Sequence, residues 1–562
     1  MSSQAEPHVP HPRQVRRGAE TFPVTSSGLE GTSRVAWGWV ALIIVLIAVR
    51  LPSLVQPAGG DQGLYGYAGQ RILAGDVMYR DVWDQKPPAI AFVYALLWGT
   101  WSDEAVVPGA DILAAVAVSW LLILLGHRRY SARVGYGAAV LFLLLGDPYL
   151  QRLSGIYVRG QCEPFIALAV TASIVLLAHP TRKRRHLIAS GLALATAFWL
   201  KYNAVAYVLP VAVAASVWSP MPVRDRRHAL ADLGWIGAGF GTVTAFLLAY
   251  FAVNGALHEL WLATIEYNLR YSNETYESPA SVARYIAGFP VVRAGIDFLW
   301  FLGGIGALLL ARRARANAST LVILCWLLAA VMSIAINGSR SLPNYFVQAN
   351  PAMALAASAG LATLATSGRL VRYAVAALML AGIWRVGSDA PVAGLRLASL
   401  PGLVENVRYD LEYVRGRMRR ETYLKRFRGQ KHDAFENEAL VRYVRDTTAA
   451  ADPVFVFGFS GGSVCWKSER ASSSRFFWSR PVIIEFASER PGYGSTGLME
   501  DLLRRPPSVV ALQKEEWRSH DSFMSNDRLR SWLLSEYVKE RETPMFSVWR
   551  QKRSPTDSEG TR

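Results

Sequence analysis

Long apolar stretches alternate with short polar loops from about residue 35 to residue 386, and polar residues dominate on both sides of this region. A helix needs about 20 mostly apolar residues to cross a bilayer, with some tolerance. About eleven stretches come close to this requirement: 35–54, 105–126, 132–150, 163–179, 186–200, 203–218, 230–253, 294–311, 319–336, 343–366 and 370–386. The pattern predicts a mainly α polytopic membrane protein with about eleven transmembrane helices.

The composition supports this class over a soluble one. Charged residues make up 18% of the 562 residues and hydrophobic residues 52%, whereas a soluble chain has about 25% charged residues. The formal net charge of +17 could indicate a nucleic-acid partner, but the lysines and arginines gather in short loops between the apolar stretches. This distribution favours membrane topology over a basic binding surface. We therefore expect membrane lipids, and no nucleic acid, as partners.

The basic loops also predict the orientation of the chain. Clusters of arginine and lysine occur at 127–129, 182–185, 224–227 and 312–315, and such clusters face the cytoplasm. All of them fall on that side if the N-terminus is cytoplasmic and the apolar run 89–101 does not cross. This run is short for a span and follows two prolines, which suit a first helical turn. We predict an interfacial helix there, in the first outer loop.

The pattern divides the chain into three regions. Residues 1–33 are polar and predict a disordered cytoplasmic tail, and residues 34–390 form the transmembrane domain. Residues 391–562 predict a small α/β domain on the outer side, with strands at "PVFVFGF", "SVVALQ" and "MFSVWRQ" and helices at "HDAFENEALVRYV" and "DRLRSWLLSEYV". The "GFSGGS" segment of this domain lacks the spacing of a nucleotide-binding loop.

The predicted orientation collects polar residues on the outer face, beginning with Asp61 in the first outer loop. Asp61 directly precedes a segment with Tyr65, Ala68 and Ile72 at helical spacing. It could therefore be the N-cap of that helix. It could equally be a general base at the membrane surface that takes a proton from an acceptor hydroxyl. The sequence leaves both interpretations open.

Three cations lie near the outer ends of the predicted spans: Lys86, Lys201 and Arg340. Lys201 interrupts an apolar run, and an ionisable residue at such a place is a functional hypothesis by default. An ammonium or guanidinium at headgroup level suits a lipid phosphate. The alternative for each is an interfacial anchor that places its charge among the lipid headgroups.

Four further polar residues belong to the same outer face: Arg159, Glu163, Asn268 and Asn344. Glu163 is close to a predicted helix start, where the helix dipole alone would favour a carboxylate. Asn268 lies in the aromatic loop 254–293, whose rings suit either a sugar or an interfacial belt. With Asp61, Glu163 and the three cations on one face, the constellation suits transfer from an anionic lipid-linked donor.

At these residues the chain resembles the integral-membrane GT-C glycosyltransferases, and among them the bacterial relatives of dolichyl-phosphate-mannose protein mannosyltransferases and of lipid A aminoarabinose transferase. The resemblance covers residues 35–390 and rests on "GDQGLYGYAGQRILAGDVMYRDVWDQKPP", "RGQCEPF", "FWLKYNAV" and "SRSLPNYFVQANPAMALAA". The strand region "ADPVFVFGFSGGSVCW" also looks like the outer domain that many bacterial members carry.

The resemblance implies a polyprenyl-phosphate-linked sugar as donor and inversion at the anomeric carbon. It implies these roles: catalytic base for Asp61, donor-phosphate contacts for Lys86, Lys201 and Arg340, and a second acidic position in the cavity for Glu163. We predict further cavity or acceptor contacts at Arg159, Tyr65, Asn268 and Asn344. Two positions depart from the family pattern, because Gln62 stands where many members have glutamate and Asn344 where many have histidine. A magnesium or manganese ion stays open, since carboxylates are present without a diagnostic ligand spacing.

We therefore predict an inverting glycosyltransferase at the outer face of a bacterial cytoplasmic membrane, with an extracytoplasmic C-terminal domain. Its acceptor would be a hydroxyl of a cell-envelope glycan, lipid or protein. One alternative is a transporter or lipid flippase of cell-envelope precursors, which would favour inverted repeats and ionisable groups near the bilayer midplane. Another is a non-catalytic binding or scaffold protein, because a fold does not fix a function.

Overall fold

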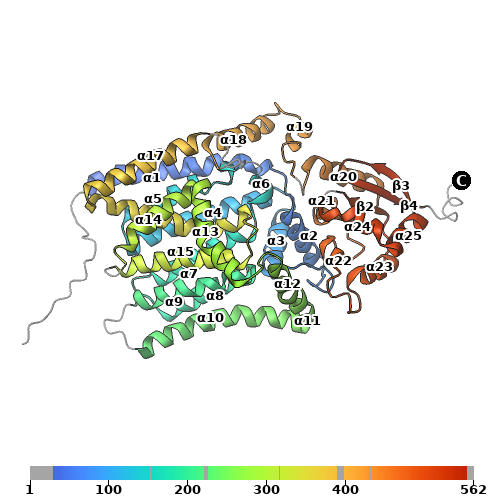
Figure 1. The fold of residues 1–562 in the computed structure, drawn as a ribbon, viewed down its shortest axis with the longest axis horizontal. Coiled ribbons are helices and arrows are strands. Elements are labelled where there is room, and N and C mark those ends of the chain that lie inside the picture. The colour runs from blue at the N-terminus through green and yellow to red at the C-terminus, as the bar shows by residue number, and fades with distance from the viewer. Residues whose placement is uncertain are drawn as a thin grey trace, which may run out of the picture.

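The computed structural model describes residues 29–151, 154–219, 226–314, 317–388, 398–429, 432–514 and 516–552. The molecule is elongated, with a bundle of helices at one end and the C-terminal domain at the other (Figure 1). Most of the predicted tail 1–33 and the predicted domain boundary near residue 390 lie outside the described residues. The first described helix, α1, begins at Leu29.

Each of the eleven predicted spans contains a helix. They are α1 (Leu29–Arg50), α4 (Val106–Arg129), α5 (Ala132–Leu145), α7 (Cys162–Leu177), α8 (Arg184–Leu200), α9 (Val208–Val217), α10 (Arg226–Val253), α14 (Phe298–Ala311), α15 (Ala318–Ile336), α16 (Asn350–Ala362) and α17 (Arg369–Gly387). Among the described residues, 5 helices are long and apolar enough to cross a membrane by length and composition. Because the other helices are shorter, the number of spans stays a prediction.

Small residues allow the helices of the bundle to approach closely. Helices α14 and α16 meet at Gly306 and Gly360, and a Cβ added to Gly306 would overlap the backbone of Ala356. Such contacts between small residues are typical of helices packed in a membrane. Polar side chains cap the helix starts, as Ser131 does for α5 by accepting a hydrogen bond from the backbone of Val134.

Further helices lie between the helices of the predicted spans and after the last of them. They are η1 (Leu51–Val55), α2 (Asp61–Leu73), α3 (Ala89–Thr100), η2 (Pro148–Leu150), α6 (Ser154–Tyr157), η3 (Tyr202–Tyr207), α11 (Leu257–Trp261), η4 (Leu262–Glu266), α12 (Tyr267–Asn273), α13 (Pro279–Ile296), η5 (Pro343–Ala349), η6 (Thr363–Thr366), α18 (Leu400–Val414) and α19 (Arg420–Leu424). The run 89–101 forms helix α3, which packs on α2. With 12 residues it extends for about 18 Å, well short of a bilayer core of about 30 Å.

The C-terminal domain contains a four-stranded sheet in the order β1-β2-β4-β3, in which only β1 and β2 are parallel. Its strands are β1 (Val454–Phe457), β2 (Val509–Gln513), β3 (Tyr537–Glu542) and β4 (Phe546–Gln551), and its helices are α20 (Ala434–Thr447), α21 (Gly461–Ser468), α22 (Arg480–Ile483), α23 (Gly494–Arg504), η7 (Glu516–Arg518), α24 (Ser519–Ser525) and α25 (Asp527–Glu536). The three predicted strands are β1, β2 and β4. The helix predicted to reach residue 538 ends at Glu536, because Tyr537 is buried and pairs with β4.

The glycine-rich "GFSGGS" segment leads into α21, which packs directly on α2. A Cβ added to Gly63 would overlap Ser463, and one added to Gly66 would overlap the ring of Trp466. The glycines of both segments therefore allow two helices to approach closely. This contact fixes the C-terminal domain against the helix that begins at Asp61.

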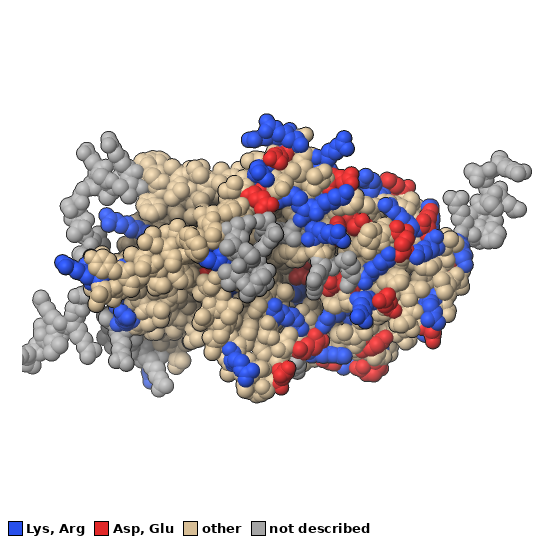
Figure 2. All heavy atoms as spheres, turned by 45° about the horizontal axis from the view of Figure 1, so that its top comes forward, with Lys and Arg blue, Asp and Glu red and all other residues tan. Residues whose placement is uncertain are grey.

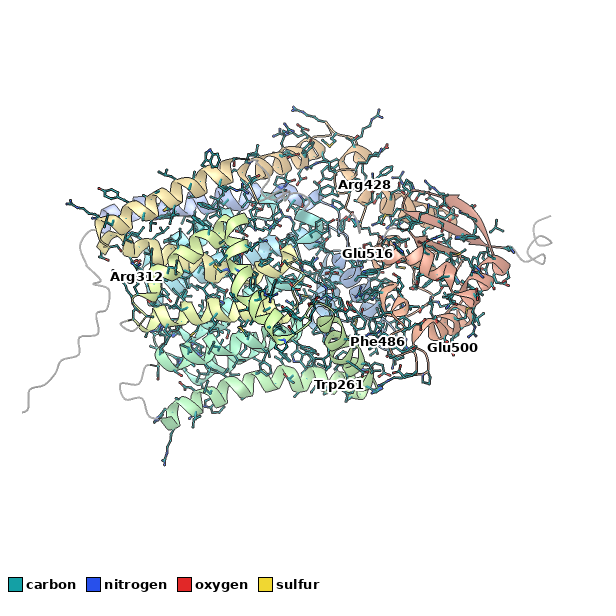
Figure 3. All side chains as sticks on the ribbon, in the orientation of Figure 1. Trp261, Arg312, Arg428, Phe486, Glu500 and Glu516 are labelled. Atoms are coloured by element: carbon teal, nitrogen blue, oxygen red, sulfur yellow. The ribbon has the colours of Figure 1, made fainter. Side chains whose placement is uncertain are left out.

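Charged side chains are unevenly distributed over the surface. In the view of Figure 2 they gather over the C-terminal domain, whereas uncharged side chains cover most of the bundle. Arg312, from one of the predicted cytoplasmic clusters, lies at the end of the bundle opposite the C-terminal domain (Figure 3). The side of the membrane on which this end of the bundle lies stays a prediction.

Candidate active site

A cavity of about 150 Å³ lies where the bundle meets the C-terminal domain. Glu516, whose neighbour Trp517 lines the cavity, lies at this junction (Figure 3). The lining residues come from both parts of the molecule: Gly60, Asp61, Leu64, Gln85, Lys86, Tyr157, Gln161, Tyr271, Leu342, Pro343, Asn344, Tyr345, His432, Phe459, Trp478, Arg480 and Trp517. The structure thus brings three predicted site residues together at one cavity: Asp61, Lys86 and Asn344.

Asp61 is the first residue of α2, and its side chain is partly exposed at the cavity. The N-cap is Gly60, which has a φ of 59° and provides no side-chain cap. This backbone conformation favours glycine. The interpretation of Asp61 as the N-cap is therefore wrong, and its carboxylate is directed to the cavity rather than to the cap of its own helix.

Lys86 lies in the loop before α3 and is held there through its backbone. The hydroxyl of Tyr79 donates to the Lys86 carbonyl at 2.8 Å, and the amide of Asn268 donates to the Gln85 carbonyl at 2.7 Å. Burial alone would lower the pKa of the Lys86 ammonium, but Asp61, together with the smaller effects of Tyr345, Cys162 and Tyr271, raises that pKa above its ordinary value. Among the described residues Lys86 makes no direct ion pair, so its charge is available to the cavity.

Glu163 and Lys201 form a second polar layer behind the cavity wall. Lys201 donates to Glu163 at 2.7 Å, and its ammonium lies 4.2 Å from the ring centre of Tyr345. The amide of Asn344 donates to the other oxygen of Glu163 at 3.4 Å. Asn344 and Tyr345 line the cavity, whereas Glu163 and Lys201 are buried and do not. The charge of Lys201 is therefore balanced by Glu163.

Arg340 stacks on Tyr271 and does not itself line the cavity. Its guanidinium is 3.6 Å from the ring centre of Tyr271, donates to the Tyr271 carbonyl at 2.9 Å and lies 3.4 Å from Glu274. Tyr271 lines the cavity and Arg340 does not. Arg340 therefore does not border the cavity, where a residue in direct contact with the donor phosphate would lie.

Arg159 and Tyr65 are both fully buried and lie outside the cavity lining. Arg159 is 3.4 Å from Asp111 and 3.8 Å from Asp147, so its charge is compensated inside the protein. Tyr65 packs edge-on against Tyr94, with 5.5 Å between ring centres. Both residues therefore support the elements that surround the cavity, and Asn268 does the same through the loop before Lys86.

Asp84 is a buried carboxyl two residues before Lys86. Burial raises the pKa of Asp84 to about 7, an effect that Lys86 opposes and Asp61 reinforces. Its Oδ1 accepts a hydrogen bond from the Gln85 backbone at 2.6 Å. Asp84 therefore changes charge near neutral pH, close to both Asp61 and Lys86.

Sequence reasoning missed the cavity residues of the C-terminal domain: His432, Phe459, Trp478, Arg480 and Trp517. An arginine among aromatic residues in "FFWSRP" was a signal that could have drawn attention to Arg480. No local pattern marks His432, whose pKa burial lowers to about 3, so that it is neutral at ordinary pH. No local sequence pattern predicts that Trp478 and Arg480 line the same cavity as Lys86, almost 400 residues earlier in the chain.

No cluster of three or more histidine, cysteine, aspartate or glutamate side chains with the geometry of a metal site occurs among the described residues. Asp61, Asp84 and Glu163 all interact electrostatically with Lys86.

Comparison with known proteins gives a match only at the level of structure. No family model and no curated protein sequence matches the chain. The chain is similar to ArnT from Cupriavidus metallidurans bound to undecaprenyl phosphate, with a TM-score of 0.59 and 14% identity over 93% of this chain and 99% of ArnT. The apo state of the same protein gives a TM-score of 0.53 and 14% identity over 92% and 98% of the two chains.

The chain is also similar to the archaeal oligosaccharyltransferase AglB from Archaeoglobus fulgidus, in complex with an inhibitory peptide and a dolichol-phosphate. The identity is 11% over 93% of this chain and 75% of AglB. The TM-score of 0.45 is too low to support an argument. The similarity to ArnT extends over nearly the full length of both chains. It fits a polytopic membrane protein. It also supports the predicted resemblance, at the level of the fold alone.

Proposed function

We propose that this protein is an inverting glycosyltransferase that moves a sugar from a polyprenyl-phosphate donor to an acceptor hydroxyl at the outer face of the cytoplasmic membrane. The observation that carries the proposal is that Asp61 and Lys86 line one cavity. The cavity belongs to a fold shared with a protein whose structure contains undecaprenyl phosphate. A carboxylate can take the proton that the acceptor hydroxyl loses, and an ammonium can stabilise the negative charge of the leaving phosphate.

Asp61 is the proposed general base. Its carboxylate takes the proton of the acceptor hydroxyl while the hydroxyl oxygen bonds to the anomeric carbon of the donor sugar. The bond between that carbon and the phosphate oxygen breaks, and its electron pair stays on the phosphate. The products are a glycoside of inverted configuration and a polyprenyl phosphate.

Lys86 is the proposed contact for the donor phosphate. The leaving phosphate is a stable anion, so a fixed positive charge helps its departure more than a general acid would. One carboxylate therefore suffices, in contrast to the pair of carboxylates that glycoside hydrolases use. The loop contacts of Tyr79 and Asn268 hold Lys86 in place.

Lys201 and Arg340 have a different place in this proposal from the one that the family resemblance implied. Lys201 is neutralised by Glu163 at 2.7 Å, and Arg340 stacks on Tyr271 without lining the cavity. Both therefore hold aromatic side chains of the cavity wall, Tyr345 and Tyr271. The acceptor is a cell-envelope glycan, lipid or protein.

The decisive experiment replaces Asp61 by asparagine in the purified full-length enzyme, reconstituted with undecaprenyl-phosphate-linked hexoses and pentoses and a cell-envelope extract. We expect kcat to fall about 100-fold or more, the usual contribution of a general base, with an unchanged thermal unfolding midpoint. Release of undecaprenyl phosphate and formation of glycoside are both measured.

Asp76→Asn is the matched control, because Asp76 pairs with Arg71 at 2.7 Å just beyond the other end of α2. Its turnover should equal that of the wild type. Near-normal turnover of Asp61→Asn would exclude Asp61 as the base. Movement of the donor across vesicles by the wild type without release of undecaprenyl phosphate would instead support a transporter.

A further inference from the structure

Arg480, the first residue of α22 in the C-terminal domain, lines the same cavity as Asp61 and Lys86. Its Nη2 lies 2.6 Å from Glu274, and its guanidinium lies 5.3 Å from the ring centre of Tyr271 and 5.5 Å from that of Trp517. Two aromatic rings and one carboxylate thus hold the guanidinium at the cavity wall.

Arg480 and Lys86 are carried by segments that pack against each other. Trp83 is three residues before Lys86, and Trp478 is two residues before Arg480. The indole of Trp478 donates to the Trp83 carbonyl at 3.3 Å, and the backbone N–H of Trp83 donates to the Arg475 carbonyl at 3.0 Å. The packing of α21 on α2 further fixes the domain against the helix that begins at Asp61. The two cations are therefore held in a common rigid frame.

The ion pair with Glu274 does not use all the N–H donors of the Arg480 guanidinium. A guanidinium has five N–H donors, and the ion pair with Glu274 uses Nη2. The Nε of Arg480 is buried and has no hydrogen-bond acceptor among the described residues. Arg480 thus retains hydrogen-bond donors for a further anionic group.

The charges around Tyr271 are also not balanced. Glu274 is the carboxylate partner of both Arg340 and Arg480, so two guanidinium groups share one negative charge. At the cavity surface itself Lys86 and Arg480 are positive and Asp61 is negative. The cavity therefore has an excess of positive charge, which attracts an anion.

We propose that Arg480 binds the phosphate of the polyprenyl-linked donor together with Lys86, so that the C-terminal domain completes the donor site. This inference rests on the proposed function. A phosphate between the ammonium and the guanidinium would receive charge-assisted hydrogen bonds from both, and arginine is especially suited to phosphate oxygens. The domain then supplies part of the binding site rather than only a cover for it.

The test measures binding of undecaprenyl phosphate to the purified full-length protein in nanodiscs, from the change in tryptophan fluorescence. Turnover is not needed. We expect Arg480→Gln to bind about 10-fold to 100-fold more weakly than the wild type, the loss typical of a hydrogen bond to a charged group. Arg480→Lys should recover part of the affinity.

Arg490→Gln is the matched control. Arg490 also belongs to the C-terminal domain and also faces a glutamate of the bundle, Glu266 at 3.6 Å, but it does not line the cavity. Its affinity for undecaprenyl phosphate should be that of the wild type. An equal loss in Arg490→Gln and Arg480→Gln would assign the effect to domain docking and overturn the inference.

Glu274→Gln separates the ion pair from the phosphate contact. This variant removes the tie between Arg480 and Glu274 and keeps the positive charge, so affinity should be equal to that of the wild type or higher. A loss as large as that of Arg480→Gln, or wild-type affinity in Arg480→Gln, would overturn the inference. Failure of the wild type to bind undecaprenyl phosphate would overturn the proposed function instead, since the Arg480 variants then have no reference affinity.

Discussion

Two groups of charged residues in this molecule contrast in how their charges are compensated. The buried charge cluster consists of Arg50, Asp111, Asp147 and Arg159, all with less than a tenth of their surface exposed and joined by ion pairs of 3.4 to 3.8 Å. The cavity cluster consists of Asp61, Lys86 and Arg480, which border open space. Of these three, Arg480 alone has an ion-pair partner among the described residues.

The difference separates structural charges from charges that can act on a ligand. A buried charge needs a partner because desolvation is otherwise too costly, and once paired it has little left for a substrate. A charge at a cavity can remain without a partner because water or a ligand solvates it. In the sequence Arg159, Lys201 and Lys86 are all cations on the predicted outer face. In the structure the charges of Arg159 and Lys201 are compensated by carboxylates, as in the buried charge cluster.

The largest predicted effect concerns stability, in the buried charge cluster. Arg159→Ala leaves Asp111 and Asp147 short of a partner, and breaking such a buried pair costs about 3–5 kcal/mol. We expect a large drop in the thermal unfolding midpoint in detergent, together with a low yield of monodisperse protein. Arg408→Ala is the control, since Arg408 forms an exposed pair with Glu412 at 3.8 Å and should change stability by less than about 1 kcal/mol. Equal midpoints for the two variants would remove the contrast between the clusters.

A smaller effect, on activity alone, is predicted for Lys86→Gln in the cavity cluster. Loss of a charge-assisted contact with the donor phosphate should lower kcat/KM about 10-fold to 100-fold, while the unfolding midpoint stays near that of the wild type because no ion pair is broken. Turnover and thermal unfolding are measured on the same preparation. Lys425→Gln, at an exposed pair with Glu421, should change neither quantity. If Lys86→Gln had a lower unfolding midpoint but wild-type turnover, Lys86 would be a structural charge rather than a donor contact.

The smallest predicted effect is a pH dependence from Asp84, whose pKa is about 7. As pH rises through 7 the carboxyl loses its proton, and the new negative charge near Lys86 weakens the attraction for the donor. We expect KM for the sugar-linked donor to rise about threefold or more between pH 6 and pH 8, as a charge interaction of about 1 kcal/mol would give. The donor is a phosphodiester and does not itself titrate in this range.

Asp84→Asn should abolish this increase in KM, and a KM that still rises by the same factor would exclude Asp84 as its source. The effect on folding has a definite sign as well. Because the folded-state pKa of Asp84 lies above its ordinary value of 3.8, its contribution to stability falls as pH rises from about 4 to 7. The unfolding midpoint of Asp84→Asn should therefore lose part of the pH dependence of the wild type.

Much of the fold could be predicted from the sequence because it depends on local patterns. The apolar stretches coincide with helices, the run 89–101 forms α3, and three strands of the C-terminal domain occur where alternation and β-branched residues indicated them. Motif residues and basic-loop counting placed Asp61, Lys86 and Asn344 on one face, and in the structure all three line one cavity. The N-cap interpretation of Asp61 was wrong, because a glycine with positive φ precedes it.

The sequence by itself thus determined the helical bundle, three of the four strands of the C-terminal sheet and the motif that carries Asp61 and Lys86. Only the tertiary structure decided which charges are compensated. It paired Lys201 with Glu163, buried Arg159 among aspartates and brought Arg480 to the cavity of Lys86. The physical reason is that a helix or strand follows from nearby residues, whereas the environment of a charge depends on which distant segment packs beside it.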